Sequence, residues 1–122
     1  MNETSAPILD HLAALGDETR LRILALLERS EFTVGELASV LRIPQPSVSR
    51  HLRTLAEEGW VEARQDGRQR HYRIAPALDE SGRALWRIVR ERLDGDGPWA
   101  VDAERAVGVL EERRLRSADS SR

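Results

Sequence analysis

A short run of polar side chains beginning at residue 45 has the types and spacing needed to read DNA bases. Arg and Gln can each form two hydrogen bonds to one base edge, and serines are small enough to let a helix enter the major groove. The residues expected to read bases are Gln45, Ser47, Ser49 and Arg50. The residues expected to contact phosphate follow them and are His51, Arg53 and Thr54. Ser49 flanks an apolar stripe, so packing inside the protein is an alternative role for it.

A helix must carry this run, because apolar residues recur behind it at helical spacing. Val48, Leu52 and Leu55 stand at i, i+4 and i+7, which predicts one buried stripe on a helix starting at about Gln45. Gly59 offers the left-handed residue that ends a helix. For this segment alone, an ordinary amphipathic surface helix explains the pattern as well as a DNA-reading helix does.

The preceding segment predicts a second short helix and a tight turn. Thr33 and Glu36 have capping-box spacing, which opens a helix running to about Leu41. Pro44 is tolerated after it because proline fits at or before the first turn of the next helix. Two short helices joined by such a turn form a helix-turn-helix unit.

Residues 61–74 change to the alternating pattern of strands, with an Asp-Gly pair at residues 66 and 67 that favours a hairpin turn. Three arginines crowd the tip of this hairpin: Arg64, Arg68 and Arg70. A charged edge that resists aggregation is the alternative interpretation. Beside a reading helix we favour a DNA-contacting wing, with Arg68 and Arg70 reaching the minor groove or its backbone.

Four further helices complete the prediction. They run from a cap at Thr4 or Ser5 to about Leu15, over about Asp17–Glu28, from Pro76 to about Leu93, and from a cap at Asp102 to about Leu115. Residues 94–98 are expected to form a plain linker, since the later ligands of a calcium loop are missing. The fold class is mainly α with a small β-hairpin. We divide the chain into a winged helix-turn-helix domain, residues 1–93, and a linker, C-terminal helix and polar tail, residues 94–122.

Composition narrows the functional class. The chain has 122 residues, no cysteine and a net charge of −2, which excludes disulfides and thiolate metal sites. Residues 41–75 hold 7 arginines against 4 acidic residues, a basic middle on an acidic body that is typical of a domain meeting phosphate on one face. All 19 cationic side chains are arginine. No signal peptide or membrane span is recognised, so we expect a soluble, cytoplasmic protein.

The segments GDETRLRILALL and TVGELASVLRIPQPSVSRHLRTLAEEGWVEARQDGRQRHYRI together resemble the ArsR family of bacterial winged-helix repressors. The resemblance covers residues 9–93 and is specific in the combination of S-V-S-R-H-L, E-G and D-G-R. It implies a homodimer built from the first and fifth helices, a palindromic DNA operator, and repression relieved by a ligand. The residues expected at the dimer interface are Ile8, Leu12, Trp86 and Val89.

The chain departs from the family at its metal-binding positions. Where many members carry Cys-x-Cys, this sequence has Thr33-Val34-Gly35-Glu36, and a second family site on the fifth helix keeps only Asp79 of its four ligands. His11 is expected to be an isolated surface residue. The sequence therefore predicts no metal site and an effector that is not a metal.

The C-terminal segment resembles the connector that follows the winged helix in ArsR–methyltransferase fusions, although no methyltransferase motif is present. This resemblance makes S-adenosylmethionine or S-adenosylhomocysteine a candidate effector, with no bound cofactor expected. A regulatory or protein-interaction module of a methyltransferase system is the alternative function. An enzyme is disfavoured, because the sequence has no catalytic triad, phosphate loop or metal set. The predicted partners are double-stranded DNA and a second copy of the chain.

Overall fold

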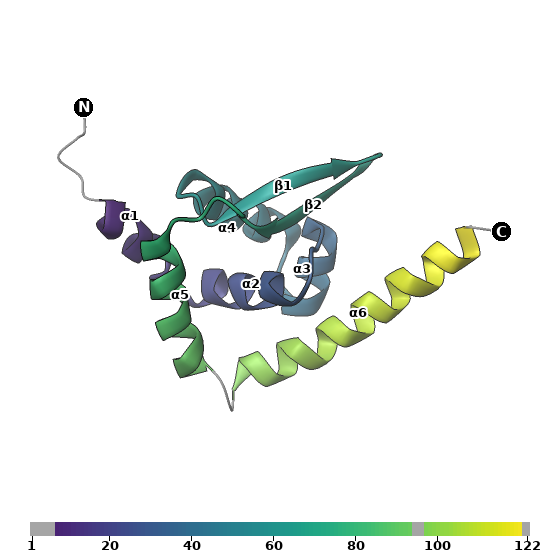
Figure 1. Cartoon of the computed structure of the whole chain (residues 1–122). Coiled ribbons are helices and arrows are strands. Elements are labelled where there is room, and N and C mark those ends of the chain that lie inside the picture. The colour runs from purple at the N-terminus through teal and green to yellow at the C-terminus, as the bar shows by residue number, and fades with distance from the viewer. Residues whose placement is uncertain (1–6, 94–96, 121–122) are drawn as a thin grey trace.

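The computed structural model describes residues 7–93 and 97–120. Its elements are α1 (Pro7–Ala14), α2 (Glu18–Arg29), α3 (Val34–Leu41), α4 (Gln45–Glu57), β1 (Val61–Asp66), β2 (Gln69–Ile74), α5 (Glu80–Leu93) and α6 (Pro98–Ser120). Helices surround one end of a two-stranded hairpin, whose other end projects from the body (Figure 1). The predicted fold class, mainly α with a small β-hairpin in a winged helix-turn-helix, is confirmed.

Local signals set the geometry of the α3–α4 unit. The Thr33 hydroxyl accepts a hydrogen bond from the Glu36 N–H at 3.1 Å, and the Glu36 carboxylate accepts one from the Thr33 N–H at 2.9 Å. This capping box satisfies two free donors at the start of α3. Arg42 ends α3 in the left-handed region, with φ of 59°, and Pro44 precedes α4 in extended conformation. The turn between the two helices is therefore tight, as predicted.

The hairpin is antiparallel and pairs Val61 with Ile74 at its base and Asp66 with Gln69 at its tip. Gly67 supplies the positive φ of 62° that the tight turn requires. Phe32 forms an isolated bridge to Tyr72 through two backbone hydrogen bonds of 3.2 and 2.8 Å, so the α2–α3 connection is paired with β2 at this one residue. A two-stranded ribbon is marginal alone, and this bridge fixes its base to the helices.

The core lies where α2, α3, α4 and the hairpin base meet. Its largest fully buried side chains are Trp60, Phe32, Ile23, Leu24, Leu26, Leu37, Leu52, Leu55, Val40 and Val48. Each buried aliphatic or aromatic side chain of this size contributes about 1.5–3 kcal/mol of transfer free energy. The apolar stripe of α4 is part of this core, so the opposite face of α4 is held outward by packing.

Two predicted helix starts were wrong. The predicted helix from Pro76 begins at Glu80 instead, because the Asp79 carboxylate accepts a hydrogen bond from the Gly82 N–H at 2.8 Å and so caps α5. The last helix begins at Pro98 rather than after Asp102. Asp102 lies inside α6, is 3% exposed, and accepts hydrogen bonds of 2.8 and 2.7 Å from Arg22.

The predicted caps at Thr4 and Ser5, and residues 94–96 of the predicted linker, lie outside the described residues. None of the helices in residues 7–93 and 97–120 has an apolar stretch that could cross a membrane.

The long helix α6 runs back along α2 and α3 and ends on the same side of the molecule as the hairpin tip (Figure 1). Arg105 donates a hydrogen bond to the Val40 carbonyl at 3.2 Å. Arg113 reaches both oxygens of the Glu36 carboxylate, at 2.7 and 2.9 Å, and its Cζ stands 5.6 Å from the centre of the Phe32 ring. The C-terminal helix therefore touches the helix-turn-helix unit directly.

Candidate nucleic-acid interface

The first two turns of α4 present an open polar surface. Gln45 and Arg50 are exposed, and Ser47 is half-buried between them. The Arg50 guanidinium donates a hydrogen bond to the Ser47 hydroxyl at 3.1 Å, which turns this side chain toward the helix N-terminus. A Cβ added to Gly35 would stand 3.4 Å from the Gln45 side-chain nitrogen, so Gly35 leaves room for the Gln45 amide beside α3. This end of α4 has the shape and groups for base reading.

A hollow of about 370 Å³ separates α4 from the hairpin and brings polar groups of both elements together. Ser49 and Arg53 line it from α4, and Arg70 and Tyr72 line it from β2. The Arg70 guanidinium stands over the Tyr72 ring, 5.8 Å from its centre. No carboxylate lines this hollow, and neither arginine pairs with one elsewhere in the described residues. The arrangement leaves two positive charges available for a phosphate.

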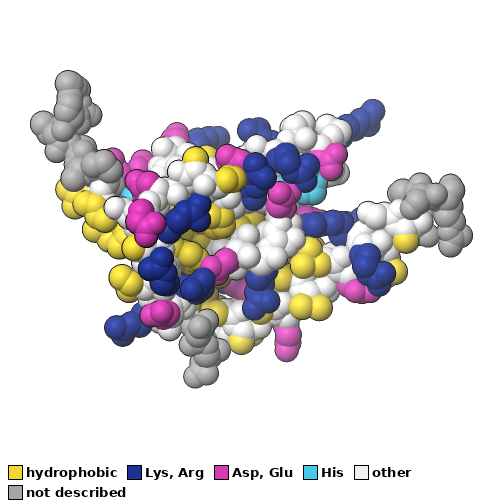
Figure 2. All heavy atoms as spheres, viewed as in Figure 1, with side chains coloured by type: hydrophobic (Ala, Val, Ile, Leu, Met, Phe, Trp, Pro, Cys, Tyr) yellow, Lys and Arg dark blue, Asp and Glu magenta, His cyan; other side chains and the backbone are white. Residues whose placement is uncertain are grey.

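The wing arginines divide into two kinds. Arg64 binds the Glu31 carboxylate at 2.7 Å, and Arg73 binds Glu62, so their charges are matched within the protein. Hydrogen bonding to Arg64 also lowers the pKa of Glu31 below its ordinary value. Arg68 is exposed in the turn and has no partner among the described residues. Of the three arginines expected to crowd the tip, Arg64 is thus anchored to the body, and Figure 2 shows a basic side chain projecting from the hairpin tip.

His51 does not face outward with the residues around it. Its Nδ1 lies 3.4 Å from Arg20 Nη1, and its Nε2 lies 3.9 Å from the carboxylate of Asp17, the residue that caps α2. Arg20 also donates hydrogen bonds to the carbonyls of Ala13 and Ala14. His51 therefore joins α4 to the start of α2, and this placement does not support the expected phosphate contact. Thr54 is half-buried and donates a hydrogen bond to the Arg50 carbonyl at 3.3 Å.

The expectation for His11 was wrong. It is 8% exposed, and its ring packs edge-on against Trp60, 5.2 Å between ring centres. Its Nε2 lies 3.5 Å from the Asp79 carboxylate at the start of α5. An isolated histidine on a short helix gives no sequence signal for such a long-range contact. His11 ties α1 to both the core and α5.

A second surface, on α1 and α5, is apolar. Ile8 and Leu12 are exposed there as expected of interface residues, and Val89 is half-buried. Trp86 instead lies in the core, where its indole N–H donates to the Glu28 carboxylate at 3.1 Å. Two residues outside the expected set, Leu9 and Ile88, are 59% and 58% exposed. We call Ile8, Leu9, Leu12 and Ile88 the α1–α5 patch; both helices pack against each other.

Metal ligands do not gather in the described part of the chain. Within residues 7–93 and 97–120, no group of three or more His, Cys, Asp or Glu side chains is placed to hold an ion. Asp79, the one family metal-site residue in this sequence, accepts a hydrogen bond from the Gly82 N–H and faces His11. The hydrogen bond from Gly82, together with the nearby His11, lowers the pKa of Asp79.

Residues 17–63 match a protein family described as "Bacterial regulatory protein, arsR family". The arsenical resistance operon repressor of Escherichia coli K12 is 38% identical over 84 residues, which are 65% of this chain and 72% of that protein. The transcriptional activator HlyU of Vibrio cholerae is 36% identical over 75 residues, 62% of this chain and 69% of that protein.

Solved structures agree with these sequence matches. HlyU from Vibrio cholerae superposes with a TM-score of 0.66 at 29% identity and covers 78% of this chain and 100% of its own. A homodimeric winged helix-turn-helix DNA-binding domain from Mycobacterium bovis has a TM-score of 0.62 at 32% identity, covering 72% of this chain and 79% of its own. The family match, residues 17–63, contains α2, α3, α4 and the first residues of β1.

Proposed function

The chain belongs to the ArsR family of bacterial regulatory proteins and is a DNA-binding transcriptional regulator, and from this premise we propose that it is a repressor that binds an inverted-repeat operator as a homodimer. We further propose that a small molecule other than a metal ion releases it from DNA. Its named relatives are regulators of transcription rather than enzymes.

The observation that carries the proposal is the hollow between α4 and the wing. It places Arg53 and Arg70 from separate elements beside Ser49, with no carboxylate among the lining residues. A phosphate held there would lie between the base-reading end of α4 and the wing. This one contact to the DNA backbone would therefore fix where both α4 and the wing lie along the duplex. We assign Gln45, Ser47 and Arg50 to bases. Ser49 was expected to read bases, but it lines the hollow, so we assign it with Arg53, Thr54, Arg68 and Arg70 to the DNA backbone or minor groove.

The α1–α5 patch supports a homodimer. Four large apolar side chains, each at least 40% exposed, lie on α1 and α5, two helices that pack against each other. A clustered apolar surface on a small domain marks an interaction site. A two-fold axis through this patch would place two reading helices on one DNA face, which matches an operator of two inverted half-sites.

A repressor role is supported by the names of relatives such as the Escherichia coli protein, whereas HlyU is named an activator. A non-metal effector is supported by the structural roles of the residues at the family's metal-binding positions. Thr33 and Glu36 form the capping box of α3 with each other, and Asp79 caps α5. These groups already have structural roles.

The test is selection of bound duplexes from a random pool with the purified chain, followed by footprinting on the genomic region around its own gene. An inverted repeat with half-sites one helical turn apart, whose occupation blocks transcription in vitro, is the expected result. Enrichment of no sequence would contradict the proposal, and enrichment of a site that raises transcription would contradict the repressor role.

A further inference from the structure

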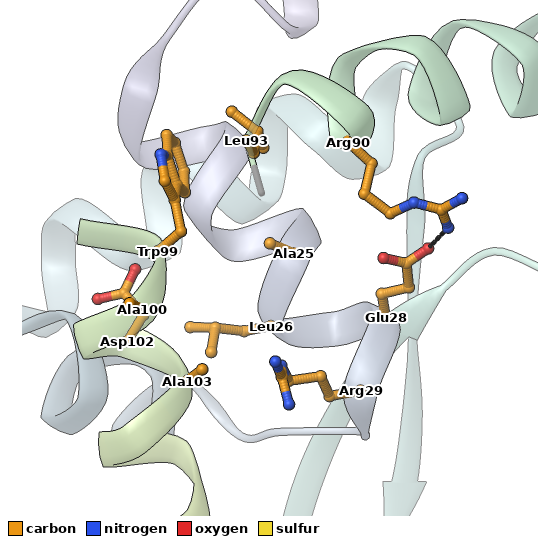
Figure 3. Close-up of a pocket in the computed structure, with 10 residues that line it drawn as sticks. All are labelled: Ala25, Leu26, Glu28, Arg29, Arg90, Leu93, Trp99, Ala100, Asp102 and Ala103. Atoms are coloured by element: carbon orange, nitrogen blue, oxygen red, sulfur yellow. Dashed lines mark hydrogen bonds and ion pairs between the residues drawn. The ribbon is translucent and has the colours of Figure 1, made fainter. Parts of the chain in front are cut away.

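A hollow with an apolar wall and charged side chains at its edge lies between α2, α5 and α6. It has a volume of about 390 Å³, within the range of small-molecule sites. Its apolar wall is formed by Leu26, Leu93 and the half-buried ring of Trp99 (Figure 3). A half-buried aromatic ring that lines a hollow beside aliphatic side chains favours a flat ligand that stacks on it.

The charges around this hollow leave one cation unmatched. Glu28 accepts hydrogen bonds from Arg90 at 2.5 Å and from Trp86 at 3.1 Å, so its charge is matched within the protein. Asp102 is likewise matched, by two hydrogen bonds from Arg22. Arg29 has no partner among the described residues, and its guanidinium points from the end of α2 toward α6 (Figure 3).

From this geometry we propose that the hollow binds a planar aromatic anion, such as an aromatic carboxylate. The ring stacks on Trp99 and packs against Leu26, and the anionic group accepts hydrogen bonds from Arg29. Guanidinium and carboxylate form charge-assisted, paired hydrogen bonds, which a neutral ligand does not provide. Arg29 and Trp99 come from different elements, so the ligand bridges α2 and α6.

The position of α6 gives such a ligand a route to the DNA-binding elements. Arg113 of α6 binds the Glu36 carboxylate that caps α3, and Arg113 and Arg116 line a hollow shared with His71 of the wing. A ligand that holds α6 against α2 therefore restrains α3 and the wing as well. Resting on the function proposed above, we infer that this ligand class is the effector and weakens operator binding.

The test uses the full chain, 2-naphthoate as the probe, and 2-naphthamide as its neutral analogue. A ligand of about 13 non-hydrogen atoms is expected to bind with Kd of about 1 mM or tighter. Binding is followed by chemical-shift titration on the ¹⁵N-labelled protein. The chain has three tryptophans, and the Trp99 indole N–H signal, identified by its absence in Trp99→Leu, should move while that of the fully buried Trp60 stays.

Two arginine variants locate the anionic group. Arg29→Ala should raise Kd about fivefold or more, as should replacing the carboxylate by the amide. Arg87→Ala is the matched control, because Arg87 is also exposed and has no partner among the described residues. It lines the neighbouring groove between α2, β2 and α5, which Arg29 lines as well, but not the proposed site. Absence of binding up to about 10 mM, equal losses in both variants, or a loss in Arg87→Ala alone would overturn the site.

The effector role has its own readout. Saturating 2-naphthoate should weaken operator binding about threefold or more, and Arg29→Ala should shift that response to about fivefold higher probe concentration. If the probe moves the Trp99 signal but leaves operator affinity unchanged, the site stands and the effector role is refuted. If no operator exists at all, the titration still decides the binding site, so the two failures are distinguishable.

Discussion

At the scale of single residues, Arg50 illustrates how α4 prepares a side chain for recognition. An exposed arginine normally samples many rotamers, and ordering it on binding costs free energy. The Ser47 hydroxyl holds the Arg50 guanidinium at 3.1 Å, toward the end of the helix that would enter a groove. This hydrogen bond reduces the number of rotamers that Arg50 samples before it binds DNA.

We predict that Arg50→Ala weakens operator binding by about 1–3 kcal/mol and affects random DNA much less, because a paired contact to a base is lost. Fluorescence-anisotropy isotherms on operator and scrambled duplexes measure both values. Equal losses on the two duplexes would instead identify Arg50 as a phosphate contact.

Arg68 should behave in the opposite way. It lies at the exposed turn of the hairpin, where it can follow the DNA backbone. Arg68→Ala is expected to weaken operator and random DNA by similar factors and to reduce the slope of log K against log salt by about one unit. Arg64→Ala is the matched control, since the Arg64 guanidinium is bound to Glu31. A purely operator-specific loss in Arg68→Ala would show that the wing reads sequence.

At the scale of elements, α6 acts as a brace across the helix-turn-helix unit. The Arg113–Glu36 pair is largely shielded, with side chains 29% and 13% exposed. Burial by itself raises the pKa of Glu36, but the hydrogen bonds from Arg113 and the Thr33 N–H outweigh it and hold the pKa below its ordinary value. The carboxylate thus stays ionised while serving both α3 and α6.

Removing the brace should destabilise the protein. Arg113→Ala is predicted to lower the free energy of unfolding by about 1–2 kcal/mol, because a partly buried carboxylate loses its charged donor. Urea denaturation followed by circular dichroism gives the value. Arg116→Ala, at an exposed position three residues further along α6, should change it by less than about 0.5 kcal/mol. Similar effects of both substitutions would mean that α6 contributes nothing specific to α3.

Elements with local signals were predictable, and those defined by distant contacts were not. The capping box of α3, the apolar stripe of α4 and the Gly67 turn are each encoded within a few residues, and all three are present. Asp102 looked like a helix cap because that residue type favours caps. Its partner Arg22 is 80 positions away, and no periodicity reveals such a pair.

The same division holds for the candidate site. Arg50 and Arg68 are exposed at the positions expected from the helix and turn patterns. His51 and Arg64 lie in the same helix and the same hairpin, yet His51 lies against Arg20 and Asp17, and Arg64 is bound to Glu31. The sequence shows which side chains are cationic and could contact DNA. Only the folded structure shows which of them are already paired with a carboxylate of the protein.

At the scale of the whole molecule, recognition of an inverted repeat depends on joining two protomers. Ile88→Glu places a charge on the α5 side of the α1–α5 patch without disturbing the core, because Ile88 is 58% exposed. We predict a monomer in sedimentation velocity and at least tenfold weaker operator binding. Val107→Glu, at an exposed position on α6, is the matched control. A dimeric Ile88→Glu variant would mean that another surface forms the dimer.

Metals should leave the complex intact. We predict that zinc, cadmium and arsenite, added below the concentration that precipitates the protein, change operator affinity less than twofold. The reason is that no suitable ligand group is present in the described residues and the sequence has no cysteine. Anisotropy titration of the preformed complex checks this, and tenfold release by any of the three ions would refute a non-metal effector.

The use of arginine at the positions assigned to DNA also limits which covalent modifications can change the charge of this surface. The four cations assigned to DNA, Arg50, Arg53, Arg68 and Arg70, carry guanidinium groups rather than amines. Acetylation neutralises lysine amines, and the sequence contains no lysine. Enzymes that acylate lysine side chains therefore cannot switch off this surface by neutralising its charge.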